Sequence, residues 1–108
     1  MPKSIQASKI KEIVFVCEAG VGSSLMSVNS LKKKLKAANV TDVSVVHLAT
    51  ARLPEDAKFV VCHKMIVKNA RMRAPEAVVV GFNLFFNDPL FDKIVKAFKE
   101  DTKITEDA

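Results

Sequence analysis

The stretch Cys17–Ser24 constrains this chain most, because it joins a short β-branched apolar run, Ile13–Val16, to a segment with helical spacing. Two of the three glycines of the chain, Gly20 and Gly22, lie in this stretch. A strand that ends in a glycine-containing loop and continues into a helix is typical of the first turn of an open parallel α/β sheet. We therefore expect a ligand-binding turn here, with a cysteine at its start.

Short apolar runs alternate with segments of helical spacing along the rest of the chain. The predicted strands are residues 12–17, 43–48, 59–62 and 77–82, and the predicted helices are residues 24–38, 63–73 and 89–99. Asn39 is expected to end the first helix, and Asp88 to cap the last helix ahead of Pro89. Strands alternating with helices imply right-handed crossovers. The predicted fold class is therefore α/β, a single-domain, Rossmann-like four-stranded parallel sheet with helices on both faces.

The apolar positions of the three predicted helices define the faces that should pack on the sheet. They are Leu25, Val28, Leu31, Leu35 and Ala38 in the first helix, Met65, Ile66, Ala70 and Met72 in the second, and Leu90, Phe91, Ile94, Val95 and Phe98 in the third. The aromatic cluster between the last strand and the last helix is also expected in the core: Phe82, Phe85, Phe86 and Phe91.

The length of 108 residues allows one domain, predicted at residues 11–100, between a flexible N-terminus, residues 1–10, and an acidic C-terminal tail, residues 101–108. No apolar run approaches the roughly 20 residues of a membrane span, and residues 1–11 lack the hydrophobic core expected of a signal peptide. We therefore expect a cytoplasmic domain that is not inserted in a membrane. Cys17 and Cys62 lack metal-ligand spacing, which predicts neither a disulfide nor a metal site.

The net charge of +5 is unevenly distributed. Lysines fill the outer face of the first predicted helix at Lys32–Lys34 and Lys36, and residues 58–75 carry five basic groups and no acid. Such a surface can dock acidic partners or simply be solvated. Nucleic acid is not expected as a partner, because the chain has no Trp or Tyr and no nucleic-acid-binding motif accompanies the charge.

The turn after the first strand has the features of a phosphate site with a built-in nucleophile. Gly20 and Gly22 permit close approach of an anion to the backbone N–H groups, and the following helix adds its positive N-terminal end. The same field favours a thiolate at Cys17. A dinucleotide-binding turn is disfavoured because Leu25 stands where a third glycine is required, and no Gly-Lys-Ser/Thr of an ATP-binding loop follows.

A cysteine-dependent phosphatase of the low-molecular-weight type is an alternative, since its loop reads Cys, five residues, Arg, Ser/Thr. Here Ser23 stands at the arginine position, followed by Ser24. The loss of a bidentate guanidinium removes the main clamp on the transferring phosphoryl group. The pair Asp88–Pro89 is similar to the general-acid Asp-Pro of that family, although helix capping explains it equally well. A non-catalytic interaction module on the same fold is a third hypothesis.

The loop closely resembles the active-site loop of the enzyme IIB component of the bacterial phosphoenolpyruvate-dependent sugar phosphotransferase system, mannitol type, which typically reads Cys-Asp-Ala-Gly-Met-Gly-Ser-Ser. The resemblance extends to the basic helix, to Leu53–Asp56, to His63-Lys64, to Ala74-Pro75 and to residues 83–90. Related ascorbate, galactitol and lactose-type domains share the fold and the cysteine, so the sugar stays open. The usual mannitol transporter carries this domain fused to a membrane part.

The resemblance implies a phosphotransferase in which Cys17 takes a phosphoryl group from a phosphohistidine of enzyme IIA. Cys17 then passes it to a polyol bound by the membrane enzyme IIC, through which the chain would associate with the membrane. No cofactor or metal is implied. His63 is a possible secondary site residue, Cys62 is expected in the core, and His47 is interpreted as a surface or capping residue. The implied phosphate-binding loop comprises Glu18, Ala19, Gly20, Val21, Gly22, Ser23 and Ser24.

Overall fold

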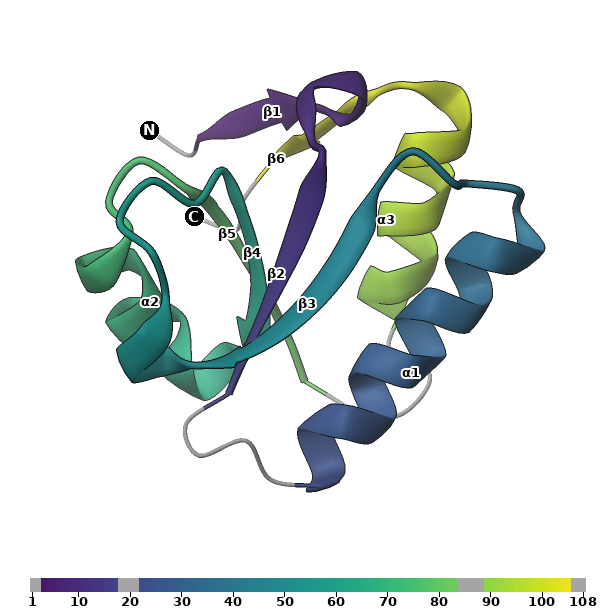
Figure 1. The fold of residues 1–108 in the computed structure, drawn as a ribbon. Coiled ribbons are helices and arrows are strands. Elements are labelled where there is room, and N and C mark those ends of the chain that lie inside the picture. Colours follow the sequence, from purple (N-terminus) through teal and green to yellow (C-terminus); the bar gives the residue numbers. More distant parts are fainter. Residues whose placement is uncertain (1–2, 18–21, 84–88, 106–108) are drawn as a thin grey trace.

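A parallel sheet of four strands forms the centre of the protein (Figure 1). The computed structural model describes residues 3–17, 22–83 and 89–105, and only the backbone of residues 22–25. The strand order is β3-β2-β4-β5, and each predicted strand agrees with the observed one to within one residue at either end. The predicted α/β fold class is therefore confirmed. The strands are β2 (Glu12–Cys17), β3 (Ser44–Ala49), β4 (Phe59–His63) and β5 (Val78–Phe82).

Helices cover both faces of this sheet. On one face lie α1 (Gly22–Ala37) and α3 (Pro89–Glu100), and on the other lies α2 (Val67–Arg73) (Figure 1). Helix α1 begins two residues before its predicted start. It ends as predicted, because Asn39 follows it with φ of 60°, in the left-handed region that Asn tolerates. The proposed cap Asp88 lies outside the described residues.

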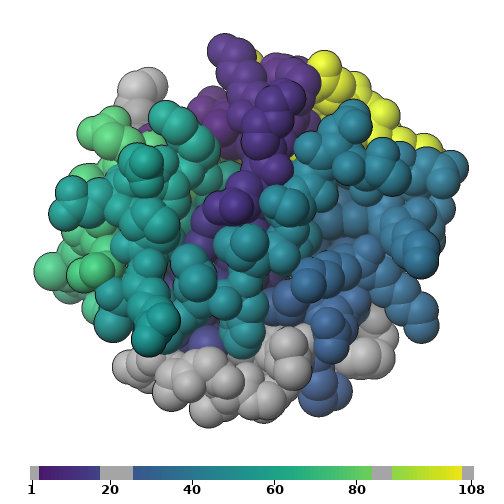
Figure 2. All heavy atoms as spheres, in the orientation of Figure 1, coloured from purple at the N-terminus to yellow at the C-terminus, as the bar shows by residue number. Residues whose placement is uncertain are grey.

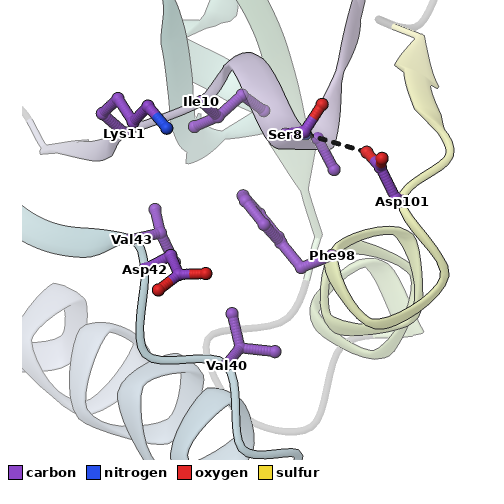
Figure 3. Close-up of a pocket in the computed structure, with 9 residues that line it drawn as sticks. Ser8, Ile10, Lys11, Val40, Asp42, Val43, Phe98 and Asp101 are labelled. Atoms are coloured by element: carbon purple, nitrogen blue, oxygen red, sulfur yellow. Dashed lines mark hydrogen bonds between the residues drawn. The ribbon is translucent and has the colours of Figure 1, made fainter.

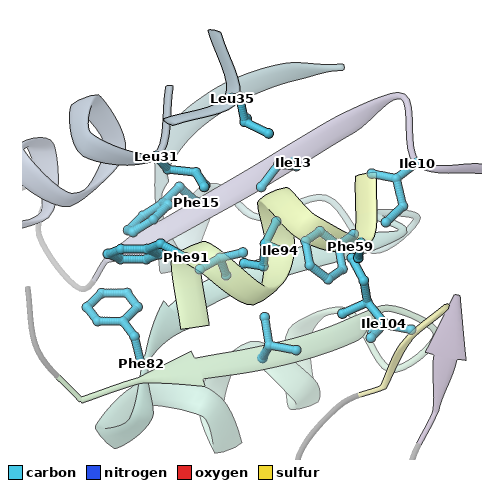
Figure 4. Packing of buried hydrophobic residues seen from close by; sticks show 14 of the residues in the cluster. Ile10, Ile13, Phe15, Leu31, Leu35, Phe59, Phe82, Phe91, Ile94 and Ile104 are labelled. Carbon is cyan, nitrogen blue, oxygen red and sulfur yellow. The ribbon is translucent and has the colours of Figure 1, made fainter. Parts of the chain in front are cut away.

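The larger part of the core lies between the sheet and the α1–α3 pair (Figure 4). Three phenylalanine rings meet there, with centroid distances of 5.4 Å from Phe82 to both Phe15 and Phe91. Tilted aromatic contacts at this spacing add to the burial of apolar area. The predicted inner faces of α1 and α3 are confirmed at Val28, Leu31, Leu35, Phe91 and Ile94, which are buried. The other predicted positions are half-buried (Ala38, Leu90, Val95 and Phe98) or, for the side chain of Leu25, outside the described residues. Phe85 and Phe86 lie outside the described residues.

The predicted inner face of the second helix is partly wrong. Ala70 is buried, but Met65 is 84% exposed and Met72 is 75% exposed. The segment begins with a 3₁₀ turn, η3 (Lys64–Ile66), before α2 starts. A 3₁₀ turn has about three residues per turn, so one continuous α-helical phase over residues 63–73 assigns the wrong side chains to the sheet. Ile66 and Val67 pack against this face beside Ala70.

Both ends of the chain carry secondary structure that the sequence did not predict. The strand β1 (Ser4–Gln6) pairs antiparallel with β6 (Lys103–Thr105), and the turn η1 (Ala7–Lys9) connects β1 to the main sheet. The structure thus differs from the expected flexible N-terminus, residues 1–10, and acidic C-terminal tail, residues 101–108, in pairing two strands from these segments. Each strand holds a single isoleucine, too little for a periodic pattern, and their partners lie at opposite ends of the sequence. This ribbon lies at the end of the molecule opposite the start of α1 (Figure 1), and the space-filling view shows the purple N-terminal and yellow C-terminal segments together at that end (Figure 2).

Asp101 joins the ribbon to the body of the protein. Its φ is 53°, and its carboxylate accepts hydrogen bonds from the Gln6 side chain at 3.1 Å and from the Ser8 backbone at 3.0 Å. These bonds, the Gln6 bond foremost, lower the pKa of Asp101 below its ordinary value of 3.8.

A hollow of about 290 Å³ opens beside Asp101, and the side chain of Phe98 projects into this hollow (Figure 3). The other lining residues are Ala7, Ser8, Ile10, Lys11, Val40, Asp42, Val43 and Asp101.

Candidate functional site

Cys17 is the last residue of β2, at the edge of the sheet where the carboxyl ends of the parallel strands meet. Helix α1 begins at the same edge, at Gly22 (Figure 1). The Cys17 residue is 5% exposed. Its carbonyl oxygen accepts a hydrogen bond of 3.1 Å from the hydroxyl of Thr50, the first residue of η2 (Thr50–Arg52). The segment after β3 therefore anchors the end of β2, a contact that the sequence did not reveal.

The N-terminus of α1 presents backbone N–H groups close to the cysteine in sequence. The first four N–H groups of a helix have no partner within it, and the aligned peptide dipoles place partial positive charge there. Gly22, Ser23 and Ser24 contribute their backbones to this first turn. Glu18, Ala19, Gly20 and Val21 lie outside the described residues, as do the side chains of Ser23 and Ser24, so their phosphate-binding role stays a prediction.

His47 lies directly beside the cysteine. Its Nε2 is 3.2 Å from the Sγ of Cys17. In the parallel pairing of β2 and β3, His47 is the register partner of Phe15, and Ala49 is the partner of Cys17. Because side chains alternate between the two faces of a strand, His47, Phe15 and Cys17 all point to the α1–α3 face. His47 is therefore a neighbour of the Cys17 sulfur, which corrects its interpretation as a surface or capping residue. The sequence could not show this contact, because the contact depends on the register between β2 and β3.

His63 ends β4, the strand on the other side of β2. Its ring packs edge-on to Phe82, with centroids 5.5 Å apart. Its Nδ1 accepts the backbone N–H of Met65 at 3.1 Å, and its Nε2 donates to the carbonyl oxygen of Asn83 at 3.2 Å. The expected secondary residue is thus at the predicted edge, where its imidazole caps η3 and ties β4 to the segment after β5.

Cys62 lies on the opposite face of the sheet from Cys17. It is the register partner of Val16, which precedes Cys17, and it belongs to the apolar cluster under α2. The residue is fully buried, and this burial raises the pKa of its thiol to about 12, although the charge of Arg71 opposes the shift. The prediction that Cys62 is a core residue is confirmed. Two cysteines on opposite faces of a sheet cannot form a disulfide, and both cysteines are free thiols.

The basic flank of α1 is partly engaged within the molecule. Lys34 pairs with Asp92 of α3 at 3.1 Å. Lys32 and Lys36 line a shallow hollow with residues of the β3 segment, Val43 and Val45. Lys34 therefore already has an ion-pair partner on α3. Within the described ranges, no group of three or more His, Cys, Asp or Glu side chains could hold a metal ion, and no helix is long and apolar enough to span a bilayer.

A comparison with protein families matches residues 12–97 to the model described as "PTS system, Lactose/Cellobiose specific IIB subunit". A solved structure with a similar fold is the lactose-specific IIB component domain of the phosphoenolpyruvate:carbohydrate phosphotransferase system from Streptococcus pneumoniae. It has a TM-score of 0.53 and 13% sequence identity, and the match covers 84% of this chain and 93% of that one. The fold and the matched region both define the class of IIB domains.

Curated relatives carry names of a different sugar class. The mannitol-specific EIICBA component of Buchnera aphidicola subsp. Acyrthosiphon pisum is 38% identical over 93 residues, which are 86% of this chain and 15% of the relative. The mannitol-specific EIICB component of Staphylococcus saprophyticus is 35% identical over 92 residues, which are 85% of this chain and 18% of the relative. The chain thus spans less than a fifth of these relatives. It belongs to the IIB family of the phosphotransferase system.

Proposed function

We propose that this chain is a phosphoryl carrier in which Cys17 accepts a phosphoryl group from the phosphohistidine of an enzyme IIA and passes it to a sugar bound by an enzyme IIC. One observation carries the proposal. The sulfur of Cys17 ends the central strand β2 at the carboxyl edge of the sheet, a few residues before the N-terminus of α1, with an imidazole nitrogen 3.2 Å away. Ligands of open parallel sheets bind at this edge.

The backbone around the cysteine suits phosphoryl transfer. The transition state places charge on three equatorial oxygens, and catalysis depends on positioning and on stabilising that charge. The N–H groups at the start of α1 and those of residues 18–24 would supply this stabilisation. Thr50 would keep the sulfur in line by holding the Cys17 carbonyl oxygen. The intermediate is then a phosphocysteine, formed and discharged at one atom.

The names of the relatives support a polyol as the final acceptor. The two relatives at 35% and 38% identity are named mannitol-specific, whereas the family model is named for lactose and cellobiose. We assign a mannitol-like polyol, since these relatives are 38% and 35% identical to this chain, whereas the solved structure named lactose-specific is 13% identical. The name EIICB joins a B component to a C component, and EIICBA adds an A component, which supports IIC and IIA as the partners and the membrane face of IIC as the site of action.

A reconstituted transfer tests this proposal. The chain is mixed with the phosphorylated IIA domain of a mannitol system, and intact mass is measured over time for the wild type, Cys17→Ala and Cys62→Ala. The wild type and Cys62→Ala should each gain one phosphoryl group, and Cys17→Ala should gain none.

Absence of any adduct while the IIA domain remains charged would contradict the carrier function. Turnover of p-nitrophenyl phosphate that depends on Cys17 would instead favour the low-molecular-weight phosphatase alternative.

A further inference from the structure

The contact between Cys17 and His47 follows from the backbone of two paired strands. In a parallel pair, register partners point to the same face, and the face repeats every second residue. Phe15 is paired with His47, so Cys17, two residues after Phe15, has its side chain on the same face as the imidazole. The distance of 3.2 Å between Sγ and Nε2 is within hydrogen-bond range for sulfur. The pair is thus fixed by six consecutive register partners rather than by a mobile surface side chain.

Packing further restricts the imidazole. The ring of His47 meets the ring of Phe15 edge-on, with centroids 6.3 Å apart and an interplanar angle of 74°. Phe15 is itself fully buried. His47 is half-buried, so solvent and a docked partner can still exchange protons with it. A ring held against an immobile aromatic side chain keeps its Nε2 directed at the sulfur.

The second histidine of the chain does not share this position. His63 uses Nδ1 to accept from Met65 and Nε2 to donate to Asn83, which fixes the proton of its neutral ring on Nε2. His47 is therefore the imidazole whose nitrogen meets the reactive sulfur. Other charged groups near this face of β3 are Lys32 and Lys36 of α1, which lie beside Val45, and Asp42, which precedes the strand.

We propose that His47 is the proton acceptor and donor for Cys17: its Nε2 takes the Sγ proton as sulfur attacks the phosphoryl group and returns it when sulfur leaves. The inference rests on the proposed carrier function. An imidazole within hydrogen-bond reach of a nucleophilic thiol is the arrangement that activates sulfur in other cysteine enzymes. While the phosphoryl group resides on sulfur, the resulting imidazolium faces its oxygens and offsets part of their charge.

The two half-reactions balance with His47 in this role. In the first, the S–P bond forms and the thiol proton moves to His47. The P–N bond of the donor phosphohistidine breaks with its electron pair left on the donor's ring nitrogen, and that nitrogen gains one proton from solvent. In the second, the O–P bond to the acceptor hydroxyl forms, the S–P bond breaks with its pair returning to sulfur, and sulfur retakes the proton from His47. The hydroxyl proton goes to solvent, so His47 begins and ends neutral.

The decisive variant is His47→Gln, whose amide can reach the same sulfur but cannot take up a proton. Alkylation of Cys17 by iodoacetamide is followed by peptide mass analysis between pH 5 and 9. Since the thiolate is the nucleophile, the variant should react about tenfold more slowly at pH 7 and reach the wild-type rate only at higher pH. His47→Asn provides a second variant if His47→Gln fails to fold, and His63→Gln is the matched control, which should keep the wild-type shape of the profile.

Single-turnover phosphorylation by a charged mannitol-type IIA domain provides the second measurement. We expect a loss of about a hundredfold in His47→Gln at pH 7, partly recovered as the pH rises. Equal alkylation profiles for wild type and His47→Gln overturn the inference, whatever happens with phosphate. A wild-type chain that never takes a phosphoryl group, yet whose alkylation depends on His47, overturns the carrier function instead and limits His47 to activating the sulfur.

Discussion

The two cysteines of this chain lie near the carboxyl ends of neighbouring strands of one sheet, and their side chains have different neighbours. Cys17 ends β2 on the α1–α3 face, beside the imidazole of His47 at 3.2 Å and ahead of a helix N-terminus. Cys62 lies on β4, one register position earlier, on the α2 face. It is surrounded by apolar side chains, and its thiol pKa is raised to about 12.

From this difference we expect that the face of the sheet, rather than the edge, decides which thiol can react. Both cysteines reach the carboxyl edge, where ligands of such folds bind. The alternation of side chains along a strand sends one sulfur toward a polar neighbour and the other into a dry cluster. Desolvation by burial keeps the Cys62 thiol protonated although the charge of Arg71 opposes this, whereas an adjacent imidazole favours a reactive thiolate.

The largest expected effect is the difference in alkylation between the two sulfurs. In the native protein at pH 7, iodoacetamide should modify Cys17 on the order of a hundredfold or more faster than Cys62, because Cys62 reacts only after local opening. Peptide mass analysis gives both rates in one sample. In guanidinium chloride the rates should converge. Equal rates under native conditions would show that the two environments are not distinct.

A substitution under α2 should weaken the protection of Cys62. Gly81 is the register partner of Cys62, and a Cβ there would lie 2.7 Å from Cγ2 of Val67 and 3.0 Å from Cα of Lys64. Gly81→Ala must therefore push η3 and α2 outward, and we expect a loss of about 1–3 kcal/mol in the free energy of unfolding. Cys62 should then be alkylated faster, while Cys17 keeps its rate.

The double variant Gly81→Ala with Val67→Ala serves as the control, because it removes the methyl group that the new Cβ meets. It should restore part of the protection of Cys62, though not all, since the Lys64 backbone still obstructs. Full stability in Gly81→Ala alone would mean that α2 is not held against β5 as tightly as the structure indicates.

The smallest expected effect concerns the end of the molecule remote from both cysteines. The pKa of Asp101 is lowered by bonds from Gln6 and Ser8 that only the folded state makes. The carboxylate therefore stabilises the fold above its ordinary pKa of 3.8, and this contribution is lost as the pH falls through the lower folded value. Asp101→Asn should lower stability modestly at pH 6, with a difference from wild type that shrinks by pH 3.

Urea unfolding at the two pH values measures this effect, since Asn also accepts the left-handed backbone at position 101. The ratio of Cys17 to Cys62 alkylation at pH 7 should be the same in Asp101→Asn as in the wild type. A changed ratio would mean that the terminal ribbon influences the environments of Cys17 and Cys62, and that the difference between the two thiols does not arise from their immediate neighbours alone.

Much of the fold could be predicted from the sequence, because the spacing of apolar residues indicates which side chains are buried. The four parallel strands, the inner faces of α1 and α3, and the left-handed Asn39 after α1 follow from local patterns. The pairing of β1 with β6 was not legible, because two three-residue strands far apart in sequence leave no periodic signal. Met65 was misplaced because a 3₁₀ turn changes the phase that an α-helical pattern assumes.

The candidate site was legible only in part. The sequence identifies Cys17 as a candidate site residue, because it lies between an apolar run and a glycine-containing turn. The sequence does not identify His47, because its role depends on which residue of β2 it faces, and the register of the strands arises from the packing of the whole sheet. Thr50 was missed for the same reason, since its hydroxyl reaches a carbonyl 33 positions earlier in the chain.

The most direct test of the account asks which sulfur carries the phosphoryl group. The chain is charged to completion by a phosphorylated mannitol-type IIA domain, treated with iodoacetamide in the native state, then denatured, alkylated with an isotopically heavy reagent and mapped by peptide mass. The account predicts that Cys17 is protected from both reagents by phosphate and that Cys62 carries only the heavy label. A Cys17 that takes up the light reagent in the charged protein would contradict it.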